Sequence, residues 1–239
     1  MRRILAIAAL PLMFVSTTAW AQDEDAEDAE ETSGAWEIDA EVGFNSDYRF
    51  RGISLSDKDV QGTAEVSVSH ESGLYFGAWA SNVALIDNAD NVEVDLYAGY
   101  ATDVGNISFD VGAVYYAYPG HNGEFGYVEL YGSIGTTVGP ATVTVGAAYA
   151  PSQGNIGHED NTYVYVSGDL PLGDSPLSLH GTFGLEDGAF GDNKKDWLVG
   201  VTFDLGGGFS ATLDYVDTAH TFNDPLGKAT VVGGVLLAF

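Results

Sequence analysis

Apolar and polar side chains alternate at every second position over much of this chain, and this feature most constrains its fold. In the first such segment, one face carries Trp36, Ile38, Ala40, Val42 and Phe44. The opposite face carries Glu37, Asp39, Glu41 and Asn45. A period of two is that of a β-strand, whose successive side chains point to opposite sides of the sheet. The pattern therefore predicts strands that separate an apolar environment from a polar one.

The same alternation recurs along the chain and predicts about twelve strands. After the strand at 36–45, we expect strands near 58–71, 73–83, 92–102, 106–118, 124–138, 141–150, 162–170, 176–186, 196–205, 208–218 and 228–239. Tight turns are expected at 72–73, 103–106, 138–140, 171–176 and 206–208. Longer polar loops are expected near 46–57, 84–91, 119–123, 151–161, 187–195 and 219–227. Short turns at one rim and longer loops at the other are typical of outer-membrane barrels.

The predicted fold class is therefore all-β: a transmembrane antiparallel up-and-down β-barrel occupying residues 34–239. An even number of strands places both termini on the same side, which is the periplasm in such barrels. A soluble β-sandwich is the alternative, because it alternates as well. Its apolar face would need bulky interlocking side chains. The apolar faces here instead include Ala78, Ala80, Ala98, Gly132, Ala147 and Gly233.

The first 33 residues are expected to lie outside the barrel. Residues 1–21 have two arginines, a short apolar run and Ala19-Trp20-Ala21, which predicts a signal peptide cleaved before Gln22. An uncleaved membrane anchor is the alternative, but a strongly acidic segment follows the apolar run. That segment, residues 22–33, has nothing to bury and is predicted to be a disordered tether.

Charge and cysteine content narrow the classes of partner. Residues 22–239 contain 35 acidic and six basic residues, a formal charge of −29. Such a chain would repel nucleic acid. The chain has no cysteine, so no disulfide framework supports it in an oxidising compartment. We expect partners at the outer membrane instead: its lipid and lipopolysaccharide, the barrel-assembly machinery, and small solutes or cations.

The polar faces predict an acidic lumen. The side chains that we expect to line it are Asp39, Glu41, Glu65, Glu93, Asp95, Asp110, Glu129, Asp169, Asp204 and Asp214. No lysine or arginine falls at an inward position of the predicted strands. Unpaired carboxylates favour a water-filled path that attracts cations. The alternative is a narrow lumen filled by side chains, including the inward tyrosines Tyr97, Tyr116, Tyr131 and Tyr165.

The six basic residues of the mature chain fall in, or beside, the predicted outer loops; they are Arg49, Arg51, Lys58, Lys194, Lys195 and Lys228. Two main hypotheses remain open for Arg49, Arg51, Lys194 and Lys195, beside a simple solvated loop. They could contact lipopolysaccharide phosphates. Alternatively, Arg49 and Arg51 fold inward and pair with lumen carboxylates such as Glu65, forming a gate. Interface girdles of aromatic side chains are expected at Trp36, Trp79, Trp197, Tyr75, Tyr100 and Tyr115.

Neither a metal centre nor an active site is evident. His121, His158 and His220 lie on separate predicted loops without ligand spacing, so no metal and no cofactor is expected. Ser178 and His180 share a face, but an inward one that a lipid ester could not reach. No Asn or Asp is placed by the sequence to orient the imidazole. The chain is not expected to be an enzyme.

The C-terminal strand also supports an outer-membrane barrel. The last predicted strand ends on Phe239, a terminal aromatic residue of the kind that the barrel-assembly machinery recognises.

Two segments of the chain resemble the TorF family of proteobacterial porins. They are Asn45-Ser46-Asp47-Tyr48-Arg49-Phe50-Arg51-Gly52-Ile53-Ser54 and Gly73-Leu74-Tyr75-Phe76-Gly77-Ala78-Trp79-Ala80-Ser81-Asn82. This resemblance covers about 36–239 and implies an outer-membrane barrel without catalytic residues.

The predicted function is an outer-membrane channel of a Gram-negative bacterium, through which small solutes diffuse, with a preference for cations. A non-conducting barrel with a structural, binding or adhesive role is the alternative, followed by a barrel lipase or protease. Nothing in the sequence indicates the solute or the oligomeric state.

Overall fold

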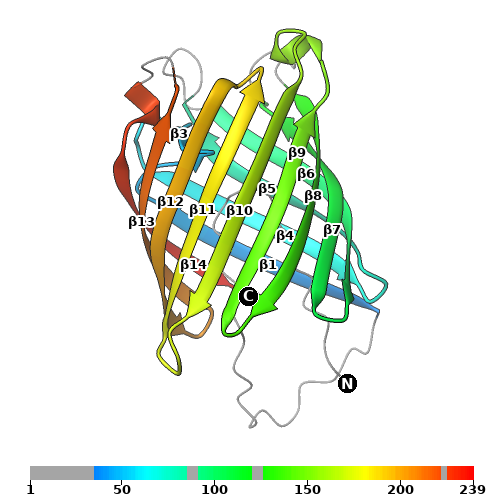
Figure 1. Cartoon of the computed structure of the whole chain (residues 1–239), viewed down its shortest axis with the longest axis vertical. Helices are drawn as coiled ribbons and strands as arrows, with labels where there is room; N and C mark the ends of the chain where they lie inside the picture. Colours follow the sequence, from blue (N-terminus) through cyan, green and yellow to red (C-terminus); the bar gives the residue numbers. More distant parts are fainter. Residues whose placement is uncertain (1–34, 85–90, 120–125, 222–224) are drawn as a thin grey trace.

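The computed structural model of this chain describes residues 35–84, 91–119, 126–221 and 225–239. In this part, twelve strands form one closed antiparallel barrel, in which β1 pairs with both β4 and β14 (Figure 1). Closure gives the first and last strands a hydrogen-bonding partner on both sides and so leaves no open edge. The predicted fold class is confirmed. No helix among these residues is long and apolar enough to cross a membrane.

The barrel strands agree closely with the predicted ranges. They are β1 Trp36–Asn45, β4 Gln61–His70, β5 Leu74–Val83, β6 Asn91–Val104, β7 Ile107–Ala117, β8 Tyr127–Val138, β9 Ala141–Ala150, β10 Asn161–Pro171, β11 Leu177–Gly188, β12 Gly191–Gly206, β13 Phe209–Ala219 and β14 Thr230–Ala238. Two short 3₁₀ helices, η1 Gly154–Ile156 and η2 Pro225–Gly227, lie in connections. The predicted signal peptide and tether lie outside the described residues.

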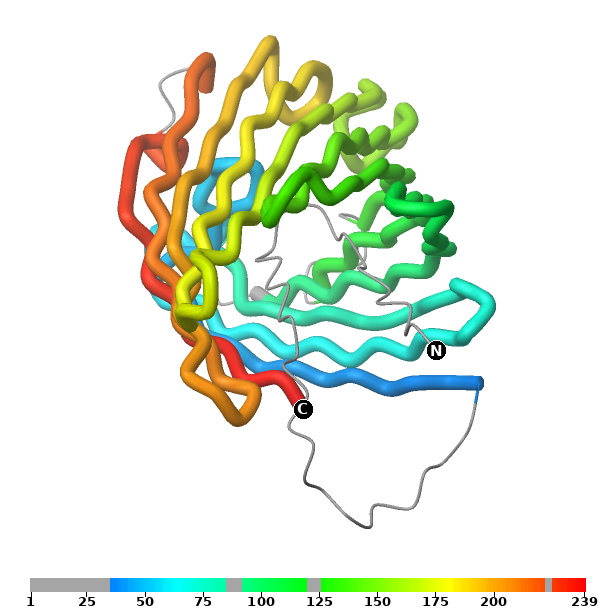
Figure 2. Tube along the Cα trace, turned by 60° about the horizontal axis from the view of Figure 1, so that its bottom comes forward, coloured from blue at the N-terminus to red at the C-terminus, as the bar shows by residue number. Residues whose placement is uncertain are grey.

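Two predicted loops differ from the structure. Residues 187–195 were expected to be a long loop, but β11 and β12 pair up to Gly188 and Gly191, so the connection is tight. Within 46–57, the chain forms a small hairpin of β2 Arg49–Phe50 and β3 Ile53–Ser54. Figure 2 shows this light-blue hairpin inside the ring of strands.

The outer surface of the barrel is apolar, as the alternation predicts. In β1, Ile38 and Phe44 are 69% and 60% exposed, whereas the intervening Gly43 and the last residue, Asn45, are buried. The same holds for other strands, for example at Val111 and Leu213. The prediction of an interface girdle is wrong for Trp79 and Tyr75, which are buried at 3% and 4% exposure. They share an inward face, because Leu74 and Phe76 take the outward positions of β5.

Inside the barrel, tyrosine rings lie across glycines of the adjacent strand. Tyr131 of β8 is opposite Gly112 of β7, and a Cβ added at Gly112 would lie 2.4 Å from the Tyr131 hydroxyl oxygen. Similar pairs join Tyr97 with Gly77 and Tyr163 with Gly184. These contacts allow large rings to lie flat along the wall instead of blocking the lumen entirely.

We expect Gly112→Ala to destabilise the barrel by about 1–3 kcal/mol, because the new methyl group must displace the Tyr131 ring. Gly132→Ala is the matched control, since a Cβ there would meet its nearest atoms at 3.4 Å, an ordinary contact distance. The measurement is the free energy of unfolding in denaturant. Equal stability of the two variants would show that the ring packing against Gly112 contributes little.

Candidate functional site: a hairpin clamped across the lumen

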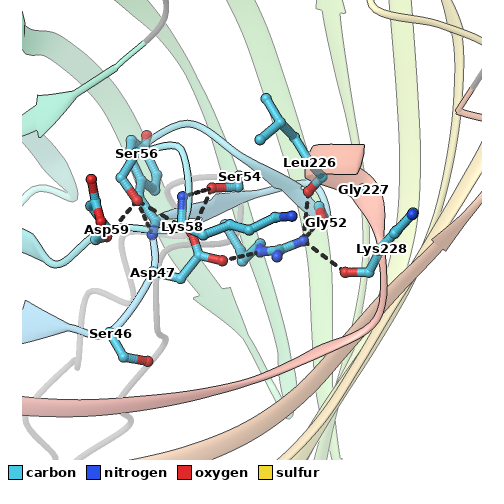
Figure 3. A network of polar contacts seen from close by, with 12 residues as sticks. Ser46, Asp47, Gly52, Ser54, Ser56, Lys58, Asp59, Leu226, Gly227 and Lys228 are labelled. Carbon is cyan, nitrogen blue, oxygen red and sulfur yellow. Dashed lines mark hydrogen bonds and ion pairs between the residues drawn. The ribbon is translucent and has the colours of Figure 1, made fainter. Parts of the chain in front are cut away.

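The candidate site is built around residues 46–59, hereafter the inner hairpin, which leave β1 and fold into the barrel. Figure 1 places β3 toward the end of the barrel opposite the C-terminus. The Asp47 carboxylate organises this segment, since its Oδ1 accepts hydrogen bonds from the hydroxyls of Ser54 (2.6 Å) and Ser56 (3.2 Å) (Figure 3). The backbone N–H of Leu55 donates to the carbonyl of Tyr48 at 2.8 Å. The segment is therefore held as one folded unit.

The tip of the inner hairpin is a tight turn at Arg51 and Gly52. Both residues have positive φ angles, 46° and 83°, as the central residues of a two-residue hairpin turn of type I′ require. A Cβ at Gly52 would lie 2.2 Å from Cγ2 of Thr218 and 3.0 Å from Cβ of Asp196. The tip thus fits closely against β12 and β13.

Arg51 carries the main contacts of the tip. Its Nη2 donates to Oε1 of Glu129 on β8 at 2.6 Å, and its Nη1 donates to Oε1 of Glu186 on β11 at 2.8 Å. The guanidinium carbon also lies 4.3 Å from the centre of the Tyr163 ring, a cation–π distance. Arg51 is 1% exposed and Glu129 is fully buried. The guanidinium therefore neutralises carboxylates from two separate strands.

These carboxylates also keep Arg51 charged. Burial would lower the pKa of Arg51, but the neighbouring Glu129 and Glu186 outweigh that effect and raise the pKa well above its usual value. A charged guanidinium is thus compatible with this dry position.

Lys194 of β12 makes further contacts at the tip. Arg51, Lys194 and the carboxylates that they contact are hereafter called the clamp. Its Nζ donates to the backbone carbonyl of Arg51 at 2.6 Å and lies 2.7 Å from Oε2 of Glu186. A longer contact of 3.6 Å joins Nζ to Asp196, whose Oδ1 accepts a hydrogen bond from the Tyr163 hydroxyl at 2.9 Å. The expectation that no basic residue lies at an inward strand position is therefore wrong. Lys194 lies on β12 because this strand begins at Gly191, five residues before its predicted start at 196.

Arg49 fixes the base of the inner hairpin. Its Nε donates to Asp47 at 2.6 Å, and its Nη1 donates to the carbonyls of Gly52 (2.9 Å), Leu226 (2.7 Å) and Lys228 (3.2 Å) (Figure 3). Leu226 belongs to η2, in the connection between β13 and β14. The hairpin is thus attached to the barrel at its base and at its tip.

The two hypotheses for the basic residues can now be separated. Arg49, Arg51 and Lys194 have side chains that are 1–5% exposed and pair with groups inside the barrel, which favours the inward-folded arrangement over contact with lipopolysaccharide for these three. The partners of Arg51 are Glu129 and Glu186 instead of the expected Glu65. Lys195 is exposed, and its contact with lipid phosphate stays a prediction.

The predicted lumen carboxylates occupy three kinds of environment. Five are buried at 0–5% exposure: Glu93, Asp95, Asp110, Glu129 and Asp214. Glu41, Glu65 and Asp169 are half-buried, and Asp39 and Asp204 are exposed. Other side chains therefore cover the buried five. Tyrosine hydroxyls hold several of them: Tyr75 donates to Asp110 at 2.6 Å, Tyr118 donates to Glu93 at 2.9 Å, and Tyr97 donates to Glu65.

A second polar cluster lies on β11, β12 and β13. His180 Nε2 is 2.7 Å from Oδ1 of Asp214, and His180 Nδ1 is 3.2 Å from the hydroxyl of Thr202. The contact crosses Gly200, where a side chain would collide with both groups. Asp214 thus orients His180, a contact that the sequence did not place because cross-strand neighbours cannot be identified from one sequence. Among the described residues, no group of three acidic or histidine side chains could hold a metal ion, and His121 lies outside them.

Sequence reasoning missed Glu186, Asp47 and Tyr163 as site residues. A signal for the inner hairpin was present: an Arg-Gly pair between Phe50 and Ile53 has the form of a two-residue turn between strand residues. No comparable signal marks Glu186, because its partner Arg51 is 135 residues away.

Solved barrels share this fold at low sequence identity. The KdgM porin aligns with a TM-score of 0.58 and 8% identity, over 84% of this chain and 98% of that one. An outer membrane channel from Pseudomonas putida F1 aligns with a TM-score of 0.55 and 10% identity, over 90% and 100%. The NanC porin aligns with a TM-score of 0.52 and 9% identity, over 85% and 99%. This chain therefore has an outer-membrane porin-like fold.

No curated protein matches the sequence. A family model does match, over residues 29–229, which include all but the end of the barrel. The chain belongs to the Gcw_chp family of bacterial proteins of unknown function.

Proposed function

We propose that this protein is an outer-membrane channel for small solutes, narrowed at one end by its inner hairpin. The apolar outer face supports a barrel surrounded by lipid, and the clamp of Arg51 and Lys194 supports a constriction. The clamp is the observation that carries the proposal. A segment that is tied across the lumen by ion pairs between side chains can be released without unfolding the barrel wall.

Cation preference follows from the balance of charge along the inward faces. Arg51 and Lys194 are engaged with Glu129, Glu186 and Asp196, so carboxylates still outnumber bases within that cluster. Further inward carboxylates, Glu41 and Glu65 among them, extend the negative wall toward the other end of the barrel. A path lined by one sign of charge attracts counter-ions and repels co-ions.

The same wall argues against acidic solutes. One structure of the KdgM porin is of its complex with disordered oligogalacturonate, an anionic chain. An acidic lumen would oppose such a ligand, so we expect small cationic or neutral solutes for this protein. A shared fold does not imply that the two barrels carry the same solute.

The same proposal includes the export of the chain, its orientation in the membrane and its assembly. Residues 1–21 are the signal peptide, both termini lie in the periplasm, and the finer family relationship is to the TorF porins. Phe239 acts as the assembly signal for the barrel-assembly machinery. It ends the chain with an outward side chain that is 70% exposed and a backbone N–H that donates to Ala40 at 2.9 Å.

A non-conducting barrel with a binding role is the second candidate, and the near-zero exposure of five lumen carboxylates favours it. Planar-bilayer recording with purified protein distinguishes the two. We expect single-channel steps and, in a salt gradient, a reversal potential of the sign that indicates cation flow. If neither the native chain nor a variant lacking the clamp produces current across the bilayer, the result would support the non-conducting barrel and contradict the channel.

A further inference from the structure

Two acidic residues of β6 face the inner hairpin from a dry position. Glu93 and Asp95 are two residues apart on one strand, so both side chains point inward, and they are 1% and 2% exposed. Tyr48 of the inner hairpin is 1% exposed and packs on Trp79, with ring centres 5.7 Å apart. Trp79 is itself the cross-strand partner of Asp95. Hairpin and wall thus meet at these residues.

Oxygen atoms at this contact lack partners. Asp95 makes no hydrogen bond or ion pair with any residue that the structure describes, and its Oδ1 is inaccessible. Oε1 of Glu93 accepts the Tyr118 hydroxyl at 2.9 Å, but Oε2 makes no hydrogen bond of normal geometry within the described chain. The Tyr48 hydroxyl interacts with Glu93 but also makes no hydrogen bond of normal geometry within the described chain. Buried polar groups are nearly always satisfied, so these oxygens from two separate elements point to a further partner.

A cation would satisfy these oxygens better than a neutral group. The charged groups that act most strongly on Asp95 are Glu93, Glu129 and Glu65, all of them acidic. Arg51 is not available, because Glu129 and Glu186 already accept its hydrogen bonds. The phenol oxygen of Tyr48 has lone pairs that can bind a cation.

We propose that a hard divalent cation, Mg²⁺ in the first place, binds between Glu93 and Asp95 of β6 and Tyr48 of the inner hairpin. The donors are all oxygens, which suits Mg²⁺ and Ca²⁺ better than softer transition metals. Within the described residues, no three acidic or histidine side chains are arranged to hold an ion unaided. Water must therefore complete the coordination, as it does for Mg²⁺ held by one or two carboxylates. The ion would tie the hairpin to β6, in addition to the contacts that Arg51 makes with β8 and β11.

The test uses the refolded full-length mature chain in detergent, free of lipopolysaccharide and treated with chelator. Calorimetric titration with Mg²⁺ should show one site per barrel, and a parallel titration with Ca²⁺ compares the two ions. We expect Asp95→Asn and Glu93→Gln to weaken Mg²⁺ binding at least tenfold. Asp110→Asn is the matched control, since Asp110 is another buried inward carboxylate, 5% exposed, outside this contact; its isotherm should match that of the native chain.

Terbium luminescence gives a second measurement. Tb³⁺ replaces hard divalent ions, and emission sensitised through the buried Trp79 should appear in the native chain and be displaced by Mg²⁺. If Asp95→Asn does not fold, Tyr48→Phe removes one oxygen and keeps both carboxylates, and should weaken binding severalfold. Native and Asp95→Asn proteins with equal isotherms, or a native chain without saturable Mg²⁺ binding, would overturn the site and indicate protonated carboxylates. These readouts are independent of conductance, so the site and the channel can fail separately.

Discussion

Replacing Arg51 with alanine is expected to open the constriction and to destabilise the barrel by about 3–5 kcal/mol, because Glu129 would keep a buried charge without its cationic partner and Glu186 would keep only Lys194. The tip would leave β12 and β13, since its other contacts there depend on the position of the Arg51 backbone. In planar bilayers, we expect single-channel conductance to rise severalfold. The free energy of unfolding, from denaturant titration, gives the stability change.

Lys58→Ala is the matched control for Arg51→Ala. Lys58 lies in the same inner hairpin and is also basic, but its side chain is exposed. Stability and conductance should both stay near the native values. If the Arg51 variant conducts like the native protein while losing stability, the clamp serves folding alone and the hairpin is not the constriction. Exchanging both Arg49 and Arg51 for glutamate should increase cation selectivity if they line the path.

The second large effect is expected at Lys194, which has a matched control beside it. Lys194→Ala removes the contacts with Glu186 and with the Arg51 carbonyl, and should destabilise the barrel by about 3–5 kcal/mol. Lys195→Ala removes an exposed charge and should change stability by less than about 0.5 kcal/mol. Denaturant unfolding of both variants, followed by the mobility of folded and unfolded barrels on a gel, measures the difference.

The comparison of the two lysines also bears on conductance. The Lys194 variant should conduct more than the native chain, because the carbonyl of Arg51 loses its donor. The Lys195 variant should conduct equally. Identical stability of the two variants would mean that the ion pairs around Lys194 do not hold the hairpin, and the constriction would then depend on Arg51 alone.

The wall of the barrel could be predicted from the sequence, whereas the contacts inside the lumen could not. The closed barrel, the positions of its strands and the outward face of β1 were all predictable, because alternation with period two is a local property of the chain. Errors occurred where a strand begins with polar residues. Gly191 to Lys195 read as a loop, although Glu186 and Lys194 are direct cross-strand partners at that position.

The division into an apolar exterior and an acidic interior is written into the residues of each strand, and it favours closure into a barrel. How the interior is filled depends instead on contacts between distant parts of the chain. Arg51 meets Glu129 and Glu186, and His180 meets Asp214, across separations of 34 to 135 residues. Such contacts depend on the register of many strand pairs and on the direction in which residues 46–59 fold, which no local pattern specifies.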